Sequence, residues 1–235
     1  MAIMTAPSSL PLIERPDKSL TDMVLQTIRD SIVNKTLPPG SRVSEAKVAA
    51  QLQVSKTPVR EALLRLREVG LVVPCERGLR VVQPSIKSTR DAYEFRAGSE
   101  RSSAFFAANR ADDEERGQFV RLAQASLRAA EAHDGAAFRQ YDRDFHHEIA
   151  LASRNAILAQ TVADSLVLTS VLRERDIAPS HDSIACGEQH VEVARAILSG
   201  RAERAGELMW EHVLHVMSLV LLADPAEQES GAGDT

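Results

Sequence analysis

The pattern of hydrophobic and polar positions changes after Pro84. Before that residue, short stretches with helical spacing alternate with turns and brief apolar runs, whereas long amphipathic stretches follow it. Apolar residues that recur every three or four positions indicate the buried side of a helix, and brief β-branched runs beside turn residues favour strands. The chain is therefore expected to consist of two parts with different designs.

The first part, residues 18–84, is predicted to hold three helices and a hairpin. Its first helix has apolar positions at helical spacing, with Ser19 or Thr21 available as a cap. Ser55 is expected to cap the third helix, and Gly70 to end it. The predicted elements are helices at 19–35, 44–52 and 55–70, and strands at 71–74 and 79–84.

Helix, short helix, turn, helix and hairpin in this order are the plan of a winged helix-turn-helix. The second helix of a helix-turn-helix enters the DNA major groove with its N-terminal residues toward the bases. Here that end reads SKTPVR, and its Lys56 and Arg60 are four residues apart, so they project from one face. They are expected to reach guanine acceptors or phosphates. The alternative is a solvated charged face, as on any amphipathic helix.

The charge of the chain is unevenly distributed. Residues 18–84 carry eleven Lys and Arg against six Asp and Glu, a net of +5. Residues 85–235 carry sixteen against twenty-five, a net of −9. This division predicts a basic module that meets a polyanion and an acidic body with another task.

The second part, residues 85–223, is predicted to be an antiparallel bundle of six helices. Aromatic residues make up only 4% of the chain while Ala and Leu are plentiful, which favours a mainly α protein. Residues 1–17 and 224–235 are interpreted as flexible tails. The helices are expected at 86–109, 112–133, 136–153, 156–175, 182–199 and 201–222.

The N-terminus lacks the basic start and apolar run of a signal peptide, and no apolar stretch is expected to approach the ~20 residues of a membrane span. The two cysteines, Cys75 and Cys186, lie far apart and form no CxxC pair. A cytoplasmic, reducing setting without membrane attachment is the interpretation.

The stretch YDRDFHHEIA, residues 141–150, holds five groups that are able to bind metal or move protons. On a helix, Asp142 and His146 are one turn apart beside the apolar stripe and can converge on one ion. Asp144, His147 and Glu148 point more toward solvent. Two ligands do not close a site, so further ligands are needed from other helices. His190 and His212, on the last two long helices, are the candidates.

Residues 43–72 resemble the DNA-binding signature of GntR-family transcription regulators. The run V-S-x-T-P-V-R-E-A-L reproduces the start of the family's recognition helix, although Lys56 stands where the family usually has Arg. That exchange keeps the charge but loses the bidentate fork. The resemblance implies that DNA is contacted by Ser55, Lys56, Thr57 and Arg60, and by Arg42, Arg77 and Gly78 around the wing.

The second part resembles the FCD ligand-binding domain of the FadR-type branch, and its six helices are more like the VanR subgroup. The likeness lies in YEFRAGSE (93–100), in the DxxFH element within YDRDFHHEIA, and in residues 188–213. It implies a homodimer whose helical domain binds a small organic acid, often through a metal. Asp142, His146, His190 and His212 match the family's metal-ligand positions, and this donor set suits Zn²⁺, Ni²⁺ or another first-row ion.

Arg96 is the expected partner of an effector carboxylate, since a guanidinium binds carboxylates in bidentate fashion. The alternative is an ordinary pair with Glu100, four residues later. Taken together, these features predict a repressor, not an enzyme, that reads a pseudo-palindromic operator and senses a carboxylate metabolite. Two alternatives stay open: a metal-dependent hydrolase with Asp144 or Glu148 as general base, and an architectural DNA-binding protein with a structural metal.

Overall fold

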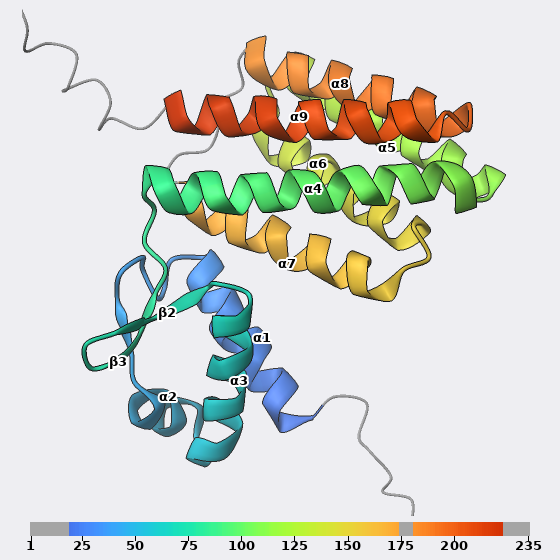
Figure 1. Ribbon diagram of the computed structural model, residues 1–235. Coiled ribbons are helices and arrows are strands. Elements are labelled where there is room, and N and C mark those ends of the chain that lie inside the picture. Colours follow the sequence, from blue (N-terminus) through green and yellow to red (C-terminus); the bar gives the residue numbers. More distant parts are fainter. Residues whose placement is uncertain (1–18, 174–180, 223–235) are drawn as a thin grey trace, which may run out of the picture.

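The computed structural model describes residues 19–173 and 181–222 (Figure 1). The expected tails at 1–17 and 224–235, and the last two residues of the helix predicted at 156–175, lie outside these described residues. We call residues 20–81 the head and residues 86–222 the body. Figure 1 shows the two packed against each other, with α7 of the body on the side that faces the head.

The head has the predicted helices and hairpin, together with one short strand that was not predicted. Its sheet is antiparallel in the order β1-β3-β2, with Arg42 opposite Arg80 and Val72 opposite Val81. The added strand has only two residues, too few for alternation of polar and apolar positions to reveal it. The elements are α1 (Leu20–Val33), β1 (Arg42–Val43), α2 (Glu45–Leu52), α3 (Lys56–Glu68), β2 (Val72–Cys75) and β3 (Gly78–Val81).

Local signals explain where the head helices begin and end. Ser19 and Asp22 form a reciprocal capping box at the start of α1. Ser55 occupies the N-cap position of α3, but its side chain makes no capping hydrogen bond, so the expected cap was wrong in that respect. Pro58 lies in the first turn of α3, where no helical hydrogen bond is lost. Gly70 follows the helix with φ +79°, a backbone conformation that glycine tolerates.

One hydrophobic cluster joins the head to the body. Val59, Leu63 and Leu66 of α3 are buried in it against Ile28 and Ile32 of α1. The same cluster takes in Ala92, Val171 and Leu172 from two helices of the body. The head is therefore packed on the body through shared apolar side chains, and not attached by the connecting residues alone.

The body is a bundle of long helices, as predicted. α4 lies along α9 and also contacts α6, α7 and α8, while α5 packs on α6 and α8. Figure 1 shows α4 and α9 running side by side across the molecule. The helices are α4 (Ile86–Arg110), α5 (Asp113–Glu131), α6 (Gly135–Ala152), α7 (Ala156–Leu172), α8 (His181–Leu198) and α9 (Ala202–Leu222).

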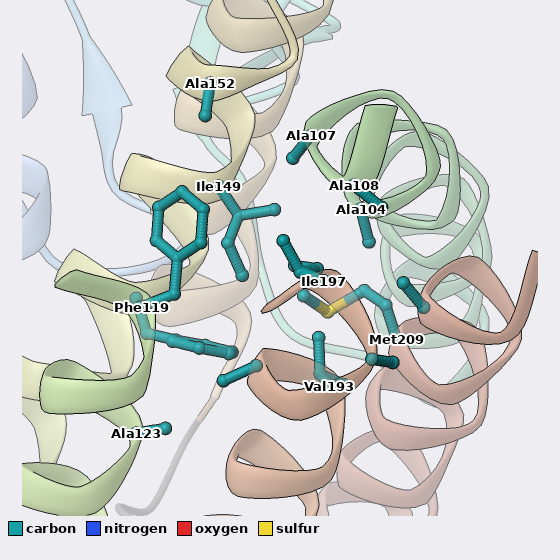
Figure 2. Close-up of a cluster of buried hydrophobic side chains, with 14 of the residues drawn as sticks. Ala104, Ala107, Ala108, Phe119, Ala123, Ile149, Ala152, Val193, Ile197 and Met209 are labelled. Carbon is teal, nitrogen blue, oxygen red and sulfur yellow. The ribbon is translucent and has the colours of Figure 1, made fainter. Parts of the chain in front are cut away.

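Large and small side chains interlock in the core of the body (Figure 2). Phe119 of α5 and Ile149 of α6 point toward Ile197 of α8 and Met209 of α9. The inner face of α4 carries alanines, among them Ala104, which lets the helices approach closely. Protein interiors are packed as densely as crystals, so the volumes of these large and small side chains set the spacing between the helices.

Within the described part of the chain, α9 is long and apolar enough to cross a membrane by length and composition. The expectation that no apolar stretch is long enough for a membrane span was therefore wrong for α9. One third of the tested window is buried, and Met209, His212 and Val213 lie in the bundle interior. A core helix satisfies the same test, so its composition is explained by packing.

Candidate metal centre and nucleic-acid interface

The four predicted metal ligands converge inside the body. Asp142 and His146 lie one turn apart on α6, His190 lies on α8 and His212 on α9. One ligand atom from each residue lies within 4.8 Å of all the others. Asp142 Oδ1 is 3.7 Å from His146 Nε2 and 3.5 Å from His190 Nε2. Three helices therefore bring one carboxylate and three imidazoles to one point.

Each imidazole is oriented by a second partner at its Nδ1 atom. Glu100 and Gln189 present oxygens that accept hydrogen bonds, so the Nδ1–H group of each facing histidine donates. Ser126 Oγ lies 3.2 Å from the third Nδ1 and is able to accept from it. Such partners fix the tautomer and the ring direction of metal-binding histidines. The pairs are His146 with Glu100, His190 with Ser126, and His212 with Gln189.

In each ring that donates from Nδ1, the Nε2 atom carries a lone pair directed at the centre. His190 Nε2 and His212 Nε2 are only 3.1 Å apart. His146 Nε2 is buried and has no hydrogen-bond partner within the described residues. The contact between His190 and His212 is a hydrogen bond if one ring carries its proton on Nε2, and it is repulsive if both rings carry it on Nδ1. A buried acceptor without a partner costs free energy, and a cation among the three Nε2 atoms would remove that cost, so this cluster can bind a metal ion.

The protonation states also suit a metal. Burial, helped by the neighbouring His146, outweighs the attraction of Asp142 and lowers the pKa of His190 to about 3. Burial likewise lowers the pKa of His212 well below its ordinary value, helped by His190 and His146. Both rings are therefore neutral near pH 7. A neutral imidazole is the form that binds metal.

The two carboxylates are held ionised. Burial alone would raise the pKa of Glu100, but the charge of Arg96 and contacts with His146 outweigh it and lower this pKa to about 2. The pKa of Asp142 is also lowered well below its ordinary value, because His146 and His190 outweigh the effect of burial. Burial by itself would lower the pKa of His146, but the attraction of Glu100 and Asp142 outweighs burial, and the pKa is raised. The centre thus offers anionic as well as neutral donors.

Arg96 lies beside this centre and pairs with Glu100, which is the alternative that remained open from the sequence. Its side chain is buried, and Nε donates to Glu100 Oε1 at 2.5 Å. Nη1 is 3.5 Å from Thr169 Oγ1 on α7. Because the other oxygen of Glu100 accepts from His146, Glu100 connects Arg96 to one of the candidate metal ligands.

The remaining groups of the YDRDFHHEIA stretch do not join the centre. Asp144 accepts hydrogen bonds from Gln140, and Glu148 lies at the surface near His147. The sequence missed the roles of Ser126 and Gln189, for which it carries no clear signal. For Glu100 a signal existed, since it lies four residues after Arg96 on the buried side of α4.

The second candidate site is the start of α3. Ser55, Lys56 and Thr57 are exposed there. Arg60 is also exposed and lies 3.2 Å from Glu45 at the start of α2. An exposed pair of this kind contributes little to stability. Arg60 can therefore exchange Glu45 for a phosphate or a base at small cost.

The wing residues gather beside this helix. Arg42, Arg77 and Gly78 line a hollow of about 480 Å³ together with Ser44 and Lys47. Arg42 Nη2 donates to the main-chain oxygen of Arg77, which ties β1 to the turn of the wing. The hairpin and the start of α2 thus form a cationic surface.

The start of α3 points away from the body. Gly70, just after the end of α3, lies against Leu168 of α7. The opposite end of the helix, with Lys56, is separated from it by the full length of α3 and lies beside α2 (Figure 1). The reading end of α3 is therefore free of the body and accessible to a duplex.

Two regions of the chain match known protein families. Residues 20–78 match the bacterial regulatory proteins of the gntR family, and residues 91–215 match the FCD domain. A protein from Paenarthrobacter nicotinovorans, named as a D-xylose utilization operon transcriptional repressor, is 32% identical, covering 81% of this chain and 85% of the relative. An Escherichia coli (strain K12) protein named for regulation of an L-lactate dehydrogenase operon is 30% identical, covering 85% of each chain.

Solved structures have the same fold. E. coli McbR/YncC aligns with a TM-score of 0.69 at 21% identity, covering 87% of this chain and 98% of that one. A GntR transcriptional regulator from Rhodococcus sp. RHA1 aligns with a TM-score of 0.63 at 24% identity, covering 87% and 98%. At these identities the likeness establishes the winged-helix and helical-bundle architecture alone.

These matches define a DNA-binding transcription regulator with a winged helix-turn-helix head and a helical body. The chain belongs to the GntR family of bacterial regulators and carries an FCD domain, which confirms the resemblance inferred from its motifs. Its relatives are regulators and not enzymes, so the hydrolase alternative is not supported.

Proposed function

We propose that this regulator is a homodimeric repressor whose body binds a divalent metal ion and a small carboxylate effector. The observation that carries the proposal is the convergence of Asp142, His146, His190 and His212, with each imidazole oriented by its own second partner. A purely structural histidine cluster needs no such alignment of three Nε2 atoms.

Asp142, His146, His190 and His212 would hold the metal, and Zn²⁺ or Ni²⁺ suits this mixture of imidazole and carboxylate donors. When bound, the ion supplies positive charge and open coordination positions for a carboxylate oxygen. Glu100 holds His146 in the required tautomer, and burial keeps His190 and His212 neutral. His190 and His212 thus need to release no proton when a metal binds, whereas the raised pKa of His146 makes its proton a competitor of the metal.

Arg96 is the proposed contact for the effector's carboxylate. It lies on α4 beside the centre, and its charge contributes to the lowered pKa of Asp142. Its pair with Glu100 fixes the guanidinium in place, which lowers the entropy lost when an anion binds. An effector held by Arg96 would therefore also act on His146 through Glu100.

The same helices provide a route to the head. Ala92, one turn before Arg96 on α4, belongs to the cluster shared with the head. On α7, Thr169 contacts Arg96, and Val171 and Leu172 enter that cluster. Effector binding would bias the placement of the head through these two helices. A coupling of about 1–3 kcal/mol changes operator affinity roughly 5- to 150-fold.

A dimer is proposed because one recognition helix reads few base pairs, and a pseudo-palindromic operator requires two heads. Support comes from the outer face of α4 and α9. A groove of about 440 Å³ is lined there by Phe105, Phe106 and Trp210, with Gly98 and Gly206 beside them. A second copy would cover these aromatic side chains. Because a DNA-binding regulator acts where the DNA of a bacterium lies, we also propose that the protein acts in the cytoplasm.

The test combines effector screening with operator binding. Small carboxylates are screened by thermal shift against the metal-loaded protein, and the best candidate is titrated in fluorescence anisotropy with an operator selected from random duplexes. We expect a change of operator affinity of about 5-fold or more. Arg96→Lys, which keeps the charge but loses the fork, should weaken effector binding and leave metal content unchanged.

Two results would contradict the proposal. Operator affinity that no bound carboxylate alters would favour the alternative of an architectural DNA-binding protein with a structural metal. Sedimentation of the protein as a monomer, both free and on the operator, would exclude the proposed dimer.

A further inference from the structure

Arg173, which directly follows α7, is joined to Arg96 through a buried tyrosine. Its Nη2 atom donates a hydrogen bond to the hydroxyl group of Tyr93 at 3.1 Å. Tyr93 is fully buried on α4, and the guanidinium carbon of Arg96 lies 5.9 Å from the centre of its ring. The two arginines therefore contact the same side chain, one at its ring and the other at its hydroxyl group.

Electrostatic effects also place Arg173 near the candidate metal centre. Burial alone would lower the pKa of Arg173, but Tyr93 and, to a smaller extent, Asp142 outweigh burial and raise it. Burial, helped by Asp142, raises the pKa of the Cys186 thiol to about 12, and both Arg173 and Arg96 oppose this rise. Because such effects weaken with distance, these groups lie close together.

Arg173 has a hydrogen-bond donor that the described residues do not use. Its Nε atom is buried and has no partner among them. A buried N–H group without a partner costs free energy, and almost all such groups in proteins have one. A bound anion is able to supply the missing acceptor, and hydrogen bonds between ionised groups are the strong ones.

The metal centre is closed on the side of its histidines and open on the side of its carboxylate. His146, His190 and His212 are at most 1% exposed. The side chain of Asp142, by contrast, is 21% exposed. Arg173 is also only partly buried. The accessible side of the centre is therefore the side with Asp142, whose charge acts on Arg173.

We propose that Arg173 is a second anion-binding residue of the effector site and that it selects a dicarboxylate as the effector. This role rests on the proposed function, in which the metal ion and Arg96 hold one carboxylate. With one oxygen on the ion and the other on Arg96, a second carboxylate is the group that brings an ionised acceptor to Arg173 Nε. A neutral hydroxyl group in its place would form a weaker hydrogen bond.

The position of Arg173 also gives the second carboxylate a part in signalling. Arg173 directly follows Val171 and Leu172, which belong to the cluster shared by head and body. Arg96 lies one turn after Ala92, which belongs to the same cluster. A dicarboxylate held by both arginines connects α4 to the end of α7. It therefore favours one relative position of the two helices that support the head.

The test is isothermal titration calorimetry on the full chain loaded with Zn²⁺, with metal content measured after each titration. The probes are malonate, succinate and glutarate, each compared with the monocarboxylate of the same chain length, which is propionate, butyrate or valerate. We expect at least one dicarboxylate to bind about tenfold or more tightly than its matched monocarboxylate. The preferred length reports the span between the two binding groups.

Arg173→Gln should remove most of this preference and leave the affinity for monocarboxylates unchanged. Arg173→Lys is the second variant, since it keeps the charge but loses the Nε donor, and it should also reduce the preference. Arg128→Gln is the charge-matched control, because Arg128 is exposed on α5, and it should behave as the wild type. Thermal unfolding verifies that each variant folds, and the lysine variant decides if the glutamine variant does not.

Three results would overturn this role of Arg173. An unchanged dicarboxylate preference in both variants would show that Arg173 only holds Tyr93 in place. Equal affinity of the wild type for matched dicarboxylates and monocarboxylates would exclude the selection and leave the proposed function intact. If none of the six probes binds, the role is also refuted, and the wider carboxylate screen described above then decides on the proposed function by itself.

Discussion

Nε2 of His190 on α8 lies 3.1 Å from Nε2 of His212 on α9. The Nδ1 atom of His212 donates to Gln189, and Ser126 Oγ lies within hydrogen-bonding distance of His190 Nδ1. Two ring nitrogens thus face each other in a buried space. Their contact is either a hydrogen bond, if one ring carries its proton on Nε2, or the approach of two ligands to a shared cation.

Removing two of the four ligands should empty the centre. Asp142→Asn with His190→Ala leaves two imidazoles, and we expect the purified protein to lose nearly all bound metal, measured by elemental analysis after dialysis. His147→Ala is the matched control, because His147 adjoins a ligand but lies largely at the surface. Equal metal content in the double variant and the wild type would contradict the assignment.

Glu100→Gln tests the orientation of His146. The substitution removes the charge that fixes the ring's Nδ1–H, so metal affinity should fall about 10- to 100-fold in a chelator competition. Glu94→Gln is the control, since Glu94 is exposed on the same helix. If both variants bind metal as tightly as the wild type, Glu100 serves only to balance Arg96.

Arg60→Ala should weaken operator binding. It should also make the slope of log K against log salt concentration shallower, by the amount expected for the loss of about one phosphate contact. The measurement is anisotropy over a salt series. Arg67→Ala is the control at the far end of the same helix. An unchanged slope for Arg60→Ala would show that this side chain pairs only with Glu45.

Two neighbouring leucines on α3 allow a test of the head core. Leu63 is 1% exposed and Leu64 is 41% exposed. Leu63→Ala should lower the free energy of unfolding by about 2–5 kcal/mol, because it leaves a cavity. Leu64→Ala should change it by less than about 0.5 kcal/mol. Urea denaturation followed by circular dichroism gives both values, and equal losses would contradict the packing.

Asp22 makes the stability of the head depend on pH. Hydrogen bonds from Ser19, and then from Arg65, hold the pKa of Asp22 below its ordinary value. A carboxyl with a lowered folded-state pKa stabilises the fold above its unfolded pKa, and this contribution is lost as the pH falls through the folded value. The difference in unfolding free energy between wild type and Asp22→Asn should therefore be largest above about pH 5 and vanish in strong acid. A difference that is constant from pH 7 to pH 2 would contradict this, and Asp30→Asn serves as the control.

Much of the architecture was predictable because it depends on local pattern. Apolar residues at helical spacing indicated the long helices of the body, with ends within a few residues of those observed. The order of elements and the run SKTPVR indicated the DNA-reading helix. The strand Arg42–Val43 was missed, because its formation depends on pairing with β3 and not on its own two residues.

The sequence by itself determined which residues are able to bind metal, DNA or a carboxylate, since those capacities belong to the side chains and their helical phase. Only the tertiary structure decided how they combine. It joined Glu100 to both Arg96 and His146, and it gave the three imidazoles their second partners. These relations connect residues on different helices, and the packing of large and small side chains, which no local pattern encodes, sets the distances between helices.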